Sequence, residues 1–132
     1  MIVVLDASLV TNALTLTTPD AVWARGQLRN DDLVAPHIMP SEVASAIRWA
    51  EIRKVLAPDT ALEAHLDLLT LPVELFPYHS FAARIWQLRA NVSVTDAWYV
   101  ALAEHLDAPL ATLNRRLTRA SGPRCRFLTP ET

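Results

Sequence analysis

Cysteine and glycine are both scarce in this sequence, with one and two residues respectively among 132. A lone thiol cannot form an intramolecular disulfide, so Cys125 indicates a reducing compartment, and we expect a cytoplasmic protein. The two glycines and nine prolines are scattered, which leaves no flexible linker and predicts one domain over residues 1–132. The apolar run at residues 1–5 has no basic residue before it and ends at Asp6, so we expect neither a signal peptide nor a membrane span.

Lysine is almost absent as well, because Lys54 is the only one. With a net charge of -2, the chain has none of the basic excess that usually accompanies nucleic-acid binding. Arginine, whose planar donors suit phosphate, is instead gathered near the end of the chain. Taken alone, this cluster is more typical of a solvated polar face; its members are Arg115, Arg116, Arg119, Arg124 and Arg126.

Short apolar runs bounded by proline, glycine or polar residues predict β-strands. The first is rich in valine, as expected for a strand buried on both faces of a parallel sheet. The predicted strands lie at residues 2–5, 33–35, 73–76, 110–113 and 127–128.

Apolar residues spaced three and four apart predict helices between these strands, at residues 41–54, 58–71, 80–90 and 93–106. Pro40 and Pro58 mark the entrances of the first two. Ser93 and Asp96 resemble a capping box with aspartate in place of glutamate. Strands that alternate with helices of this length predict an α/β protein with a parallel sheet flanked by helices.

Acidic residues fall at positions where such folds place ligands. Asp6 follows the first predicted strand, and Glu42 and Asp96 lie in the first turns of two predicted helices. Each has a structural explanation, since an aspartate caps a helix and the helix dipole favours a first-turn acid by roughly 0.3 to 1 kcal/mol. Together they indicate a metal, because carboxylates about 4 Å apart repel by roughly 4 kcal/mol at an effective dielectric of 20, and a divalent cation reverses that penalty.

The side chains available favour a hard cation over zinc. Carboxylate oxygens are preferred by Mg²⁺, with Mn²⁺ as a possible substitute. The four histidines are dispersed and show no zinc-site spacing, so we interpret them as structural or surface residues; they are His37, His65, His79 and His105.

Four segments in order along the chain resemble the PIN-domain ribonucleases of the VapC toxin family. A strand that ends in Asp-x-Ser is common, and the resemblance depends on the combination of all four. The segments are Val-Val-Leu-Asp-Ala-Ser at 3–8, Pro-Ser-Glu-Val at 40–43, Thr-Asp-Ala-Trp-Tyr-Val-Ala-Leu-Ala at 95–103, and Leu-Ala-Thr-Leu-Asn-Arg-Arg-Leu at 110–117.

The resemblance implies a three-layer α/β/α fold, with a central parallel sheet of about five strands and an acidic pocket at their carboxyl ends. It implies a Mg²⁺-dependent endoribonuclease that hydrolyses RNA phosphodiester bonds with a metal-bound water. Asp6, Glu42 and Asp96 match the family's metal-binding acids, and Asn114 stands where the family usually has a further acid. The remaining expected site residues are Ser8 and Thr112, as hydroxyl partners near the metal ligands, and Arg115 and Arg116, as phosphate contacts.

The resemblance also implies protein partners, namely a second copy of the chain and a small VapB-like antitoxin. We expect an apolar groove for the antitoxin near the end of the Glu42 helix, although core packing is the more common role for each residue taken singly. Three tryptophans, Trp23, Trp86 and Trp98, are expected in the core or a dimer contact rather than in base stacking. The groove residues are Trp49, Ile52, Val55 and Leu56.

Other functions compete with this interpretation. The foremost is a PIN fold with weak or no catalysis that binds RNA or an antitoxin, which Asn114 in place of an acid favours. A phosphate-accepting domain of the flavodoxin-like type needs paired acids near the first strand and a late lysine, and the sequence has neither. Serine-nucleophile chemistry is remote, because Ser8, Ser41 and Ser121 lack a Gly-x-Ser-x-Gly setting.

Overall fold

The computed structural model describes residues 1–131, and within them the strands form one all-parallel sheet. The five strands lie in the order β3-β2-β1-β4-β5. This confirms the predicted parallel sheet of about five strands. The strands are β1 (Ile2–Leu5), β2 (Asp32–Pro36), β3 (Val73–Phe76), β4 (Leu110–Ala111) and β5 (Phe127–Leu128).

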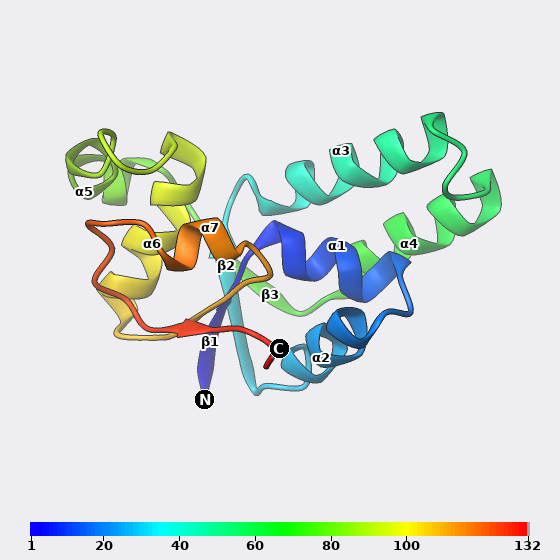
Figure 1. Ribbon diagram of the computed structural model, residues 1–132, viewed down its shortest axis with the longest axis horizontal. Helices are drawn as coiled ribbons and strands as arrows, with labels where there is room; N and C mark the ends of the chain where they lie inside the picture. The colour runs from blue at the N-terminus through cyan, green and yellow to red at the C-terminus, as the bar shows by residue number, and fades with distance from the viewer. Residues whose placement is uncertain (132) are drawn as a thin grey trace.

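Helices cover both faces of the sheet, which confirms the predicted three-layer α/β/α architecture. Helices α1 to α4 lie on one side of the sheet, and α5 and α6 lie on the other (Figure 1). None of the described helices is long and apolar enough to cross a lipid bilayer. The helices are α1 (Ala7–Thr15), α2 (Pro19–Gln27), α3 (Met39–Ile52), α4 (Pro58–Thr70), α5 (Ala82–Gln87), α6 (Val94–Leu106) and α7 (Arg115–Thr118).

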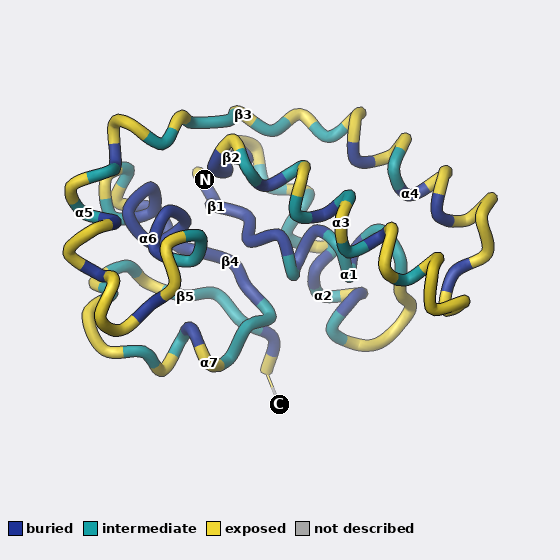
Figure 2. Tube along the Cα trace, turned by 90° about the horizontal axis from the view of Figure 1, so that it is seen from above, coloured by how far each residue is buried: buried dark blue, intermediate teal, exposed yellow. Residues whose placement is uncertain are grey.

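The centre of the molecule is formed by β1 and α6. Val3, Val4 and Leu5 are fully buried because β1 has a strand on each side and a helical layer on each face. Helix α6 is buried along most of its length, and both elements are dark blue in Figure 2. The chain order reverses between β1 and β4, and their carboxyl ends therefore flank the point where parallel α/β sheets place ligands.

The structure departs from the sequence prediction at several elements. The helix predicted at 80–90 is a 3₁₀ turn, His79–Phe81, followed by the short α5. The strand predicted at 110–113 pairs only over Leu110–Ala111, and the hydroxyl of Thr112, the next residue, donates to Asp6. Helices α1, α2 and α7 were not predicted, although Thr18 caps α2 at the amide of Ala21 and Pro19 follows it, which is a recognisable start signal.

The structure narrows the roles expected for several apolar residues. Trp86 is 58% exposed, so it lies outside the core and the dimer contact stays its predicted role; the Arg89 guanidinium lies 4.6 Å from its ring centroid. Trp98 is buried, as expected. Leu56 is only 8% exposed and belongs to the core, because its amide folds back onto the carbonyl of Ala50 at the end of α3. The other proposed groove residues, Trp49, Ile52 and Val55, are exposed.

Candidate functional site

Asp6 stands at the carboxyl end of β1 and at the start of α1, and it is only 5% exposed. The hydroxyls of Ser8 and Thr112 both donate to its Oδ2, over 3.0 and 2.5 Å. Its Oδ1 accepts no bond from either hydroxyl. Burial raises the pKa of the Asp6 carboxyl above its ordinary value, and the bonds from the two hydroxyls and from the backbone of Ala7 and Ser8 oppose this without cancelling it.

The two hydroxyls are themselves oriented by the backbone after β4. The amide of Leu113 donates to Ser8 Oγ over 3.3 Å, and the amide of Asn114 donates to Thr112 Oγ1 over 2.9 Å. Because an amide can only donate, each hydroxyl oxygen accepts from the backbone and its own proton is free to point at Asp6. The network therefore joins the ends of β1 and β4 and fixes the direction of the Asp6 carboxylate.

Glu42 comes from the opposite side of the site, in the first turn of α3. Its Oε1 accepts a 2.6 Å hydrogen bond from the hydroxyl of Tyr99, which is fully buried on α6. Burial and the bond to Glu42 both raise the pKa of Tyr99, so the phenol stays protonated and acts as a donor. The sequence interpretation missed Tyr99. The available signal was its spacing, because Tyr99 follows Asp96 by three residues and so shares its helix face.

Asp96 lies in the first turn of α6, behind the N-cap residue Ser93. The Asp96 amide donates to Ser93 Oγ over 3.2 Å, so the serine half of the predicted capping box is present. Burial raises the pKa of the Asp96 carboxyl, and the nearby negative charge of Asp6 raises it further. Asp96 therefore lies close enough to Asp6 for the two charges to interact.

The three acids form one electrostatic cluster at the carboxyl edge of the sheet. The pKa of Glu42 is raised first by burial and then by the charges of Asp6 and Asp96, while the bond from Tyr99 opposes the shift. Within the described part of the chain, no group of three or more His, Cys, Asp or Glu side chains is close enough to hold a metal ion. Metal binding by these acids therefore stays a prediction.

The chemistry of the cluster nevertheless suits a hard divalent cation. Its donors are carboxylate and hydroxyl oxygens only, which Mg²⁺ and Mn²⁺ prefer. Burial disfavours the negative charge of all three acids, and nearby negative charge further disfavours the ionised forms of Glu42 and Asp96. A bound dication would offset both effects. Asp6, Glu42 and Asp96 are the residues that would hold it.

Asn114 has a structural task in addition to any role at the site. It is the N-cap of α7, and its Oδ1 accepts the amide of Leu117 over 3.2 Å. The two arginines that follow differ from each other. Arg115 is partly buried and donates to the carbonyl of Pro130 over 3.4 Å, whereas Arg116 is exposed.

Comparison with known protein families gives a match over most of the chain. Residues 3–123 match the family described as "PIN domain". The chain is 39% identical over 120 residues to Ribonuclease VapC12 of Mycobacterium tuberculosis, which covers 91% of this chain and 92% of that protein. It is also 39% identical over 124 residues to Ribonuclease VapC1 of the same species, covering 92% of each.

Solved structures share the fold at much lower sequence identity. VapBC2 from Rickettsia felis, bound to a DNA fragment from its promoter, superposes with a TM-score of 0.67 at 14% identity, covering 97% of this chain and 98% of that one. FitAcB from Neisseria gonorrhoeae gives a TM-score of 0.71 at 16% identity and covers 96% of each chain. These two likenesses support the three-layer fold described above.

Proposed function

The chain belongs to the PIN-domain family, and from that membership we propose that it is a Mg²⁺-dependent endoribonuclease, the toxin of a VapBC-type toxin–antitoxin pair. The observation that carries the proposal is the cluster of Asp6, Glu42 and Asp96, in which burial raises the pKa of all three acids and nearby negative charge raises the pKa of Glu42 and Asp96 further. Neighbouring buried acids whose ionised forms are disfavoured in this way are typical of a site that binds a cation.

In this proposal Asp6, Glu42 and Asp96 hold Mg²⁺, for which Mn²⁺ can substitute. When bound, the ion lowers the pKa of a water and neutralises charge on the phosphate that is cut. Ser8 and Thr112 keep the Asp6 carboxylate in one orientation through its Oδ2, which leaves Oδ1 for the ligand. Asn114 contributes an amide beside the acids while it caps α7.

Glu42 also acts as the base for the attacking water, and Tyr99 orients its carboxylate for this role. Because the Tyr99 hydroxyl engages Oε1, the other oxygen of Glu42 is the one able to accept a proton from the attacking water. Tyr99 is a positioning residue, since it acts on the substrate only through Glu42. The full burial of its ring prevents the carboxylate from turning away.

The proposed partners follow from the same membership. RNA is the substrate, and the exposed Arg116 is the better placed of the two predicted phosphate contacts, because Arg115 is tied to Pro130. A VapB-like antitoxin is the regulatory partner, and a second copy of the chain is expected to form a homodimer. Exposed Trp49, Ile52 and Val55 at the end of α3 offer apolar anchors for a protein partner.

A second candidate is a PIN domain that binds RNA or an antitoxin without cutting RNA. The observation that favours it is Asn114, which places a neutral, cap-forming amide at a position usually held by an acid. Fewer negative charges weaken the attraction for a cation.

Cleavage of a structured RNA separates the two candidates. We expect cutting by the wild-type protein with Mg²⁺, none with EDTA, and none by Asp6→Asn under either condition. Asp59→Asn is the matched control, because it makes the same change at an exposed first-turn aspartate of α4 and should cut like the wild type. Binding of RNA without Mg²⁺-dependent cutting would favour the non-catalytic module, and cutting that survives EDTA would contradict the metal.

A further inference from the structure

A basic hollow is formed by α7, the segment that follows it and the turn between α5 and α6. It measures about 400 Å³ and is lined by Asn91, Arg116, Arg119 and Ala120. Asn91 belongs to the turn between α5 and α6, and the other lining residues belong to α7 and the segment that follows it. The lining residues therefore carry two guanidinium groups, one amide and one methyl group, and none of them is acidic.

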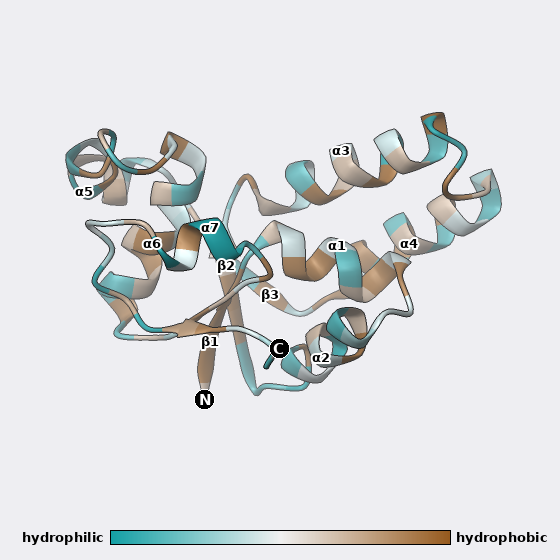
Figure 3. Cartoon of the chain, viewed as in Figure 1, coloured by the Kyte–Doolittle hydropathy of each residue, from teal (hydrophilic) through white to brown (hydrophobic). Residues whose placement is uncertain are grey.

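The two arginines of the hollow carry uncompensated charge. Arg116 lies in α7 and Arg119 directly follows it, and a spacing of three residues on a helix places side chains on one side. Figure 3 shows part of α7 in the teal of hydrophilic residues. Among the described side chains the only ion pair is Arg84 with Glu104, so neither arginine has an acidic partner. Arg119 is steadied at Nε by the carbonyl of Arg115, 3.2 Å away, which leaves its terminal nitrogens available to a ligand. Two neighbouring positive charges of this kind favour an anion between them.

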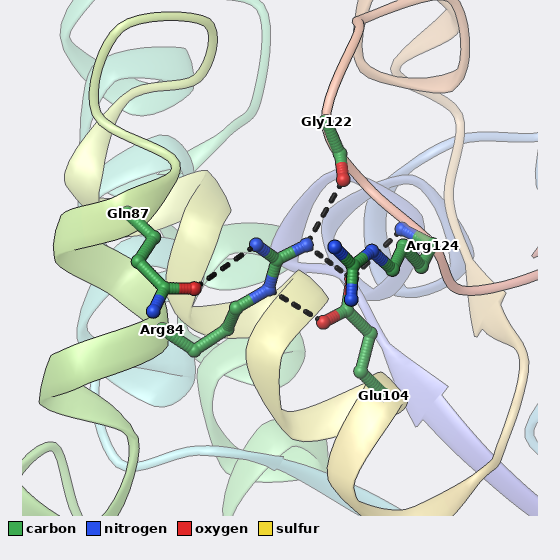
Figure 4. Close-up of polar contacts among 5 residues, drawn as sticks. All are labelled: Arg84, Gln87, Glu104, Gly122 and Arg124. Atoms are coloured by element: carbon green, nitrogen blue, oxygen red, sulfur yellow. Dashed lines mark hydrogen bonds and ion pairs between the residues drawn. The ribbon is translucent and has the colours of Figure 1, made fainter.

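The opposite wall of the hollow is held in place by a network around Gly122. A Cβ at Gly122 would lie 3.2 Å from Asn91 Nδ2 and 3.1 Å from Leu88, and the residue has φ +106°, so only glycine lets the chain pass this close. Arg84 donates to the Gly122 carbonyl over 2.9 Å and to Glu104 over 2.7 and 3.0 Å (Figure 4).

The same network anchors the chain beyond Gly122. The amide of Arg124 donates to Glu104 Oε2 over 2.8 Å (Figure 4). Arg84 on α5 and Glu104 on α6 thus hold the segment after α7 against the α5–α6 turn. Because these contacts exist in the protein alone, the segment around Gly122 and the neighbouring Asn91 are positioned before any ligand arrives.

The lining residues of the hollow are close in sequence to residues of the acidic site. Asn91 precedes Asp96 by five residues, and Arg116 follows Asn114 by two. None of the three acids lines the hollow, so an anion bound there is separate from a group held at the acids. The lining also lacks a large apolar side chain, which an acidic peptide would need as an anchor, whereas arginine and amide donors are sufficient for a phosphate.

We propose that the hollow of Asn91, Arg116 and Arg119 binds a backbone phosphate of the RNA other than the one that is cut. The inference rests on the proposed ribonuclease function and deepens it, because it adds Asn91 and Arg119 to the substrate-binding surface. A second phosphate contact fixes the direction in which the strand crosses the acidic cluster.

The test is the affinity for a fluorescently labelled single-stranded RNA, measured by anisotropy in EDTA so that no cutting occurs. We expect the double variant Arg116→Ala/Arg119→Ala to bind roughly tenfold more weakly, and the slope of log affinity against log salt to fall by about 0.7, the value for one phosphate of a single strand. Asn91→Asp, which keeps the size of the side chain but adds a negative charge, should weaken binding in the same direction. Arg29→Ala removes an exposed arginine after α2 and is the matched control, with unchanged affinity expected.

The outcomes separate this inference from the proposed function. If RNA affinity stays at the wild-type value in both the double variant and Asn91→Asp, the hollow does not bind RNA, even if the wild type cuts RNA. Loss of affinity for a VapB-like antitoxin with unchanged RNA binding also overturns the inference. The wild type could instead cut no RNA, while RNA affinity falls in both variants and not in Arg29→Ala. That result would support RNA binding by the hollow and contradict the ribonuclease proposal.

Discussion

The hydroxyl of Tyr99 donates a 2.6 Å hydrogen bond to Glu42 Oε1, across 57 residues of sequence, and so ties α6 to the first turn of α3. The bond crosses the candidate site from one helical layer to the other. Asp6, at the end of the central strand, adds the third carboxylate of the cluster. Each layer of the fold therefore contributes one acid, and the relative placement of the layers determines the site.

Replacement of Tyr99 by phenylalanine removes this bond and keeps the buried ring. Because a hydrogen bond to a charged group contributes about 1.5 to 3 kcal/mol, we expect a lower free energy of unfolding by that order, together with a drop in kcat of about tenfold. Denaturant unfolding and RNA-cleavage kinetics measure the two effects. Tyr78→Phe is the control, since Tyr78 packs edge-on against Trp98 through its ring, and a drop of equal size there would contradict a specific role for the Tyr99 hydroxyl.

Replacement of Asp6 by asparagine should stabilise the protein in EDTA while it abolishes cutting. The raised pKa means that the buried negative charge disfavours the folded state at neutral pH, and an asparagine carbonyl can still accept the bonds from Ser8 and Thr112. We expect a higher Tm by a few degrees in EDTA, and a smaller rise with added Mg²⁺ than the wild type gives. A lower Tm of Asp6→Asn than of the wild type in EDTA would show that the buried Asp6 charge does not destabilise the folded state.

Replacement of Asn114 by aspartate tests the neutral amide in the site. Aspartate caps a helix as well as asparagine does, so the cap of α7 should survive while the cluster gains a negative charge. We expect half-maximal cleavage at a lower Mg²⁺ concentration. Asn114→Ala is the contrasting variant, because it loses the cap and about 1 kcal/mol of stability without adding charge. An unchanged or higher Mg²⁺ requirement in Asn114→Asp would place residue 114 outside the influence of the metal.

Glu104 gives a stability change whose dependence on pH has a definite sign. Burial alone would raise the pKa of Glu104, but the bonds from Arg84 and from the amide of Arg124 lower it below its ordinary value. Because the folded-state pKa is lower than that of the unfolded chain, the stabilisation is present at neutral pH and is lost as pH falls through the lowered pKa. Glu104→Gln should therefore unfold more easily than the wild type at neutral pH, by about 1 to 3 kcal/mol, and the difference should shrink in acid. A difference that stays constant with pH would contradict an ionised Glu104 as the source.

The elements predicted from sequence were those with a strong local signal. The strands at Ile2–Leu5, Val73–Phe76 and Phe127–Leu128 were predicted to the residue, because each is a short run rich in apolar residues that ends before a polar residue or a proline. Helix α7 has only four residues, too few for a periodic pattern. Helix α1 has no side-chain cap to mark its start.

The contacts of the site also fall into those that the sequence suggests and those that depend on tertiary packing. The contacts of Ser8 and Thr112 with Asp6 follow from neighbouring ends of parallel strands, which a sequence pattern can suggest. The pairing of Tyr99 with Glu42 depends on how two helical layers pack across the sheet. The closeness of Asn91 to Arg119 depends on a loop that folds back at Gly122, and no local pattern encodes either contact.

Anomalous diffraction from a crystal soaked in Mn²⁺ shows whether Asp6, Glu42 and Asp96 hold a divalent cation. We expect a peak within coordination distance of carboxylate oxygens from Asp6 and at least one of the other two acids, and no such peak in Asp96→Asn crystals soaked in the same way. A wild-type crystal with Mn²⁺ bound elsewhere and none at these acids would show that the three acids do not form a cation site.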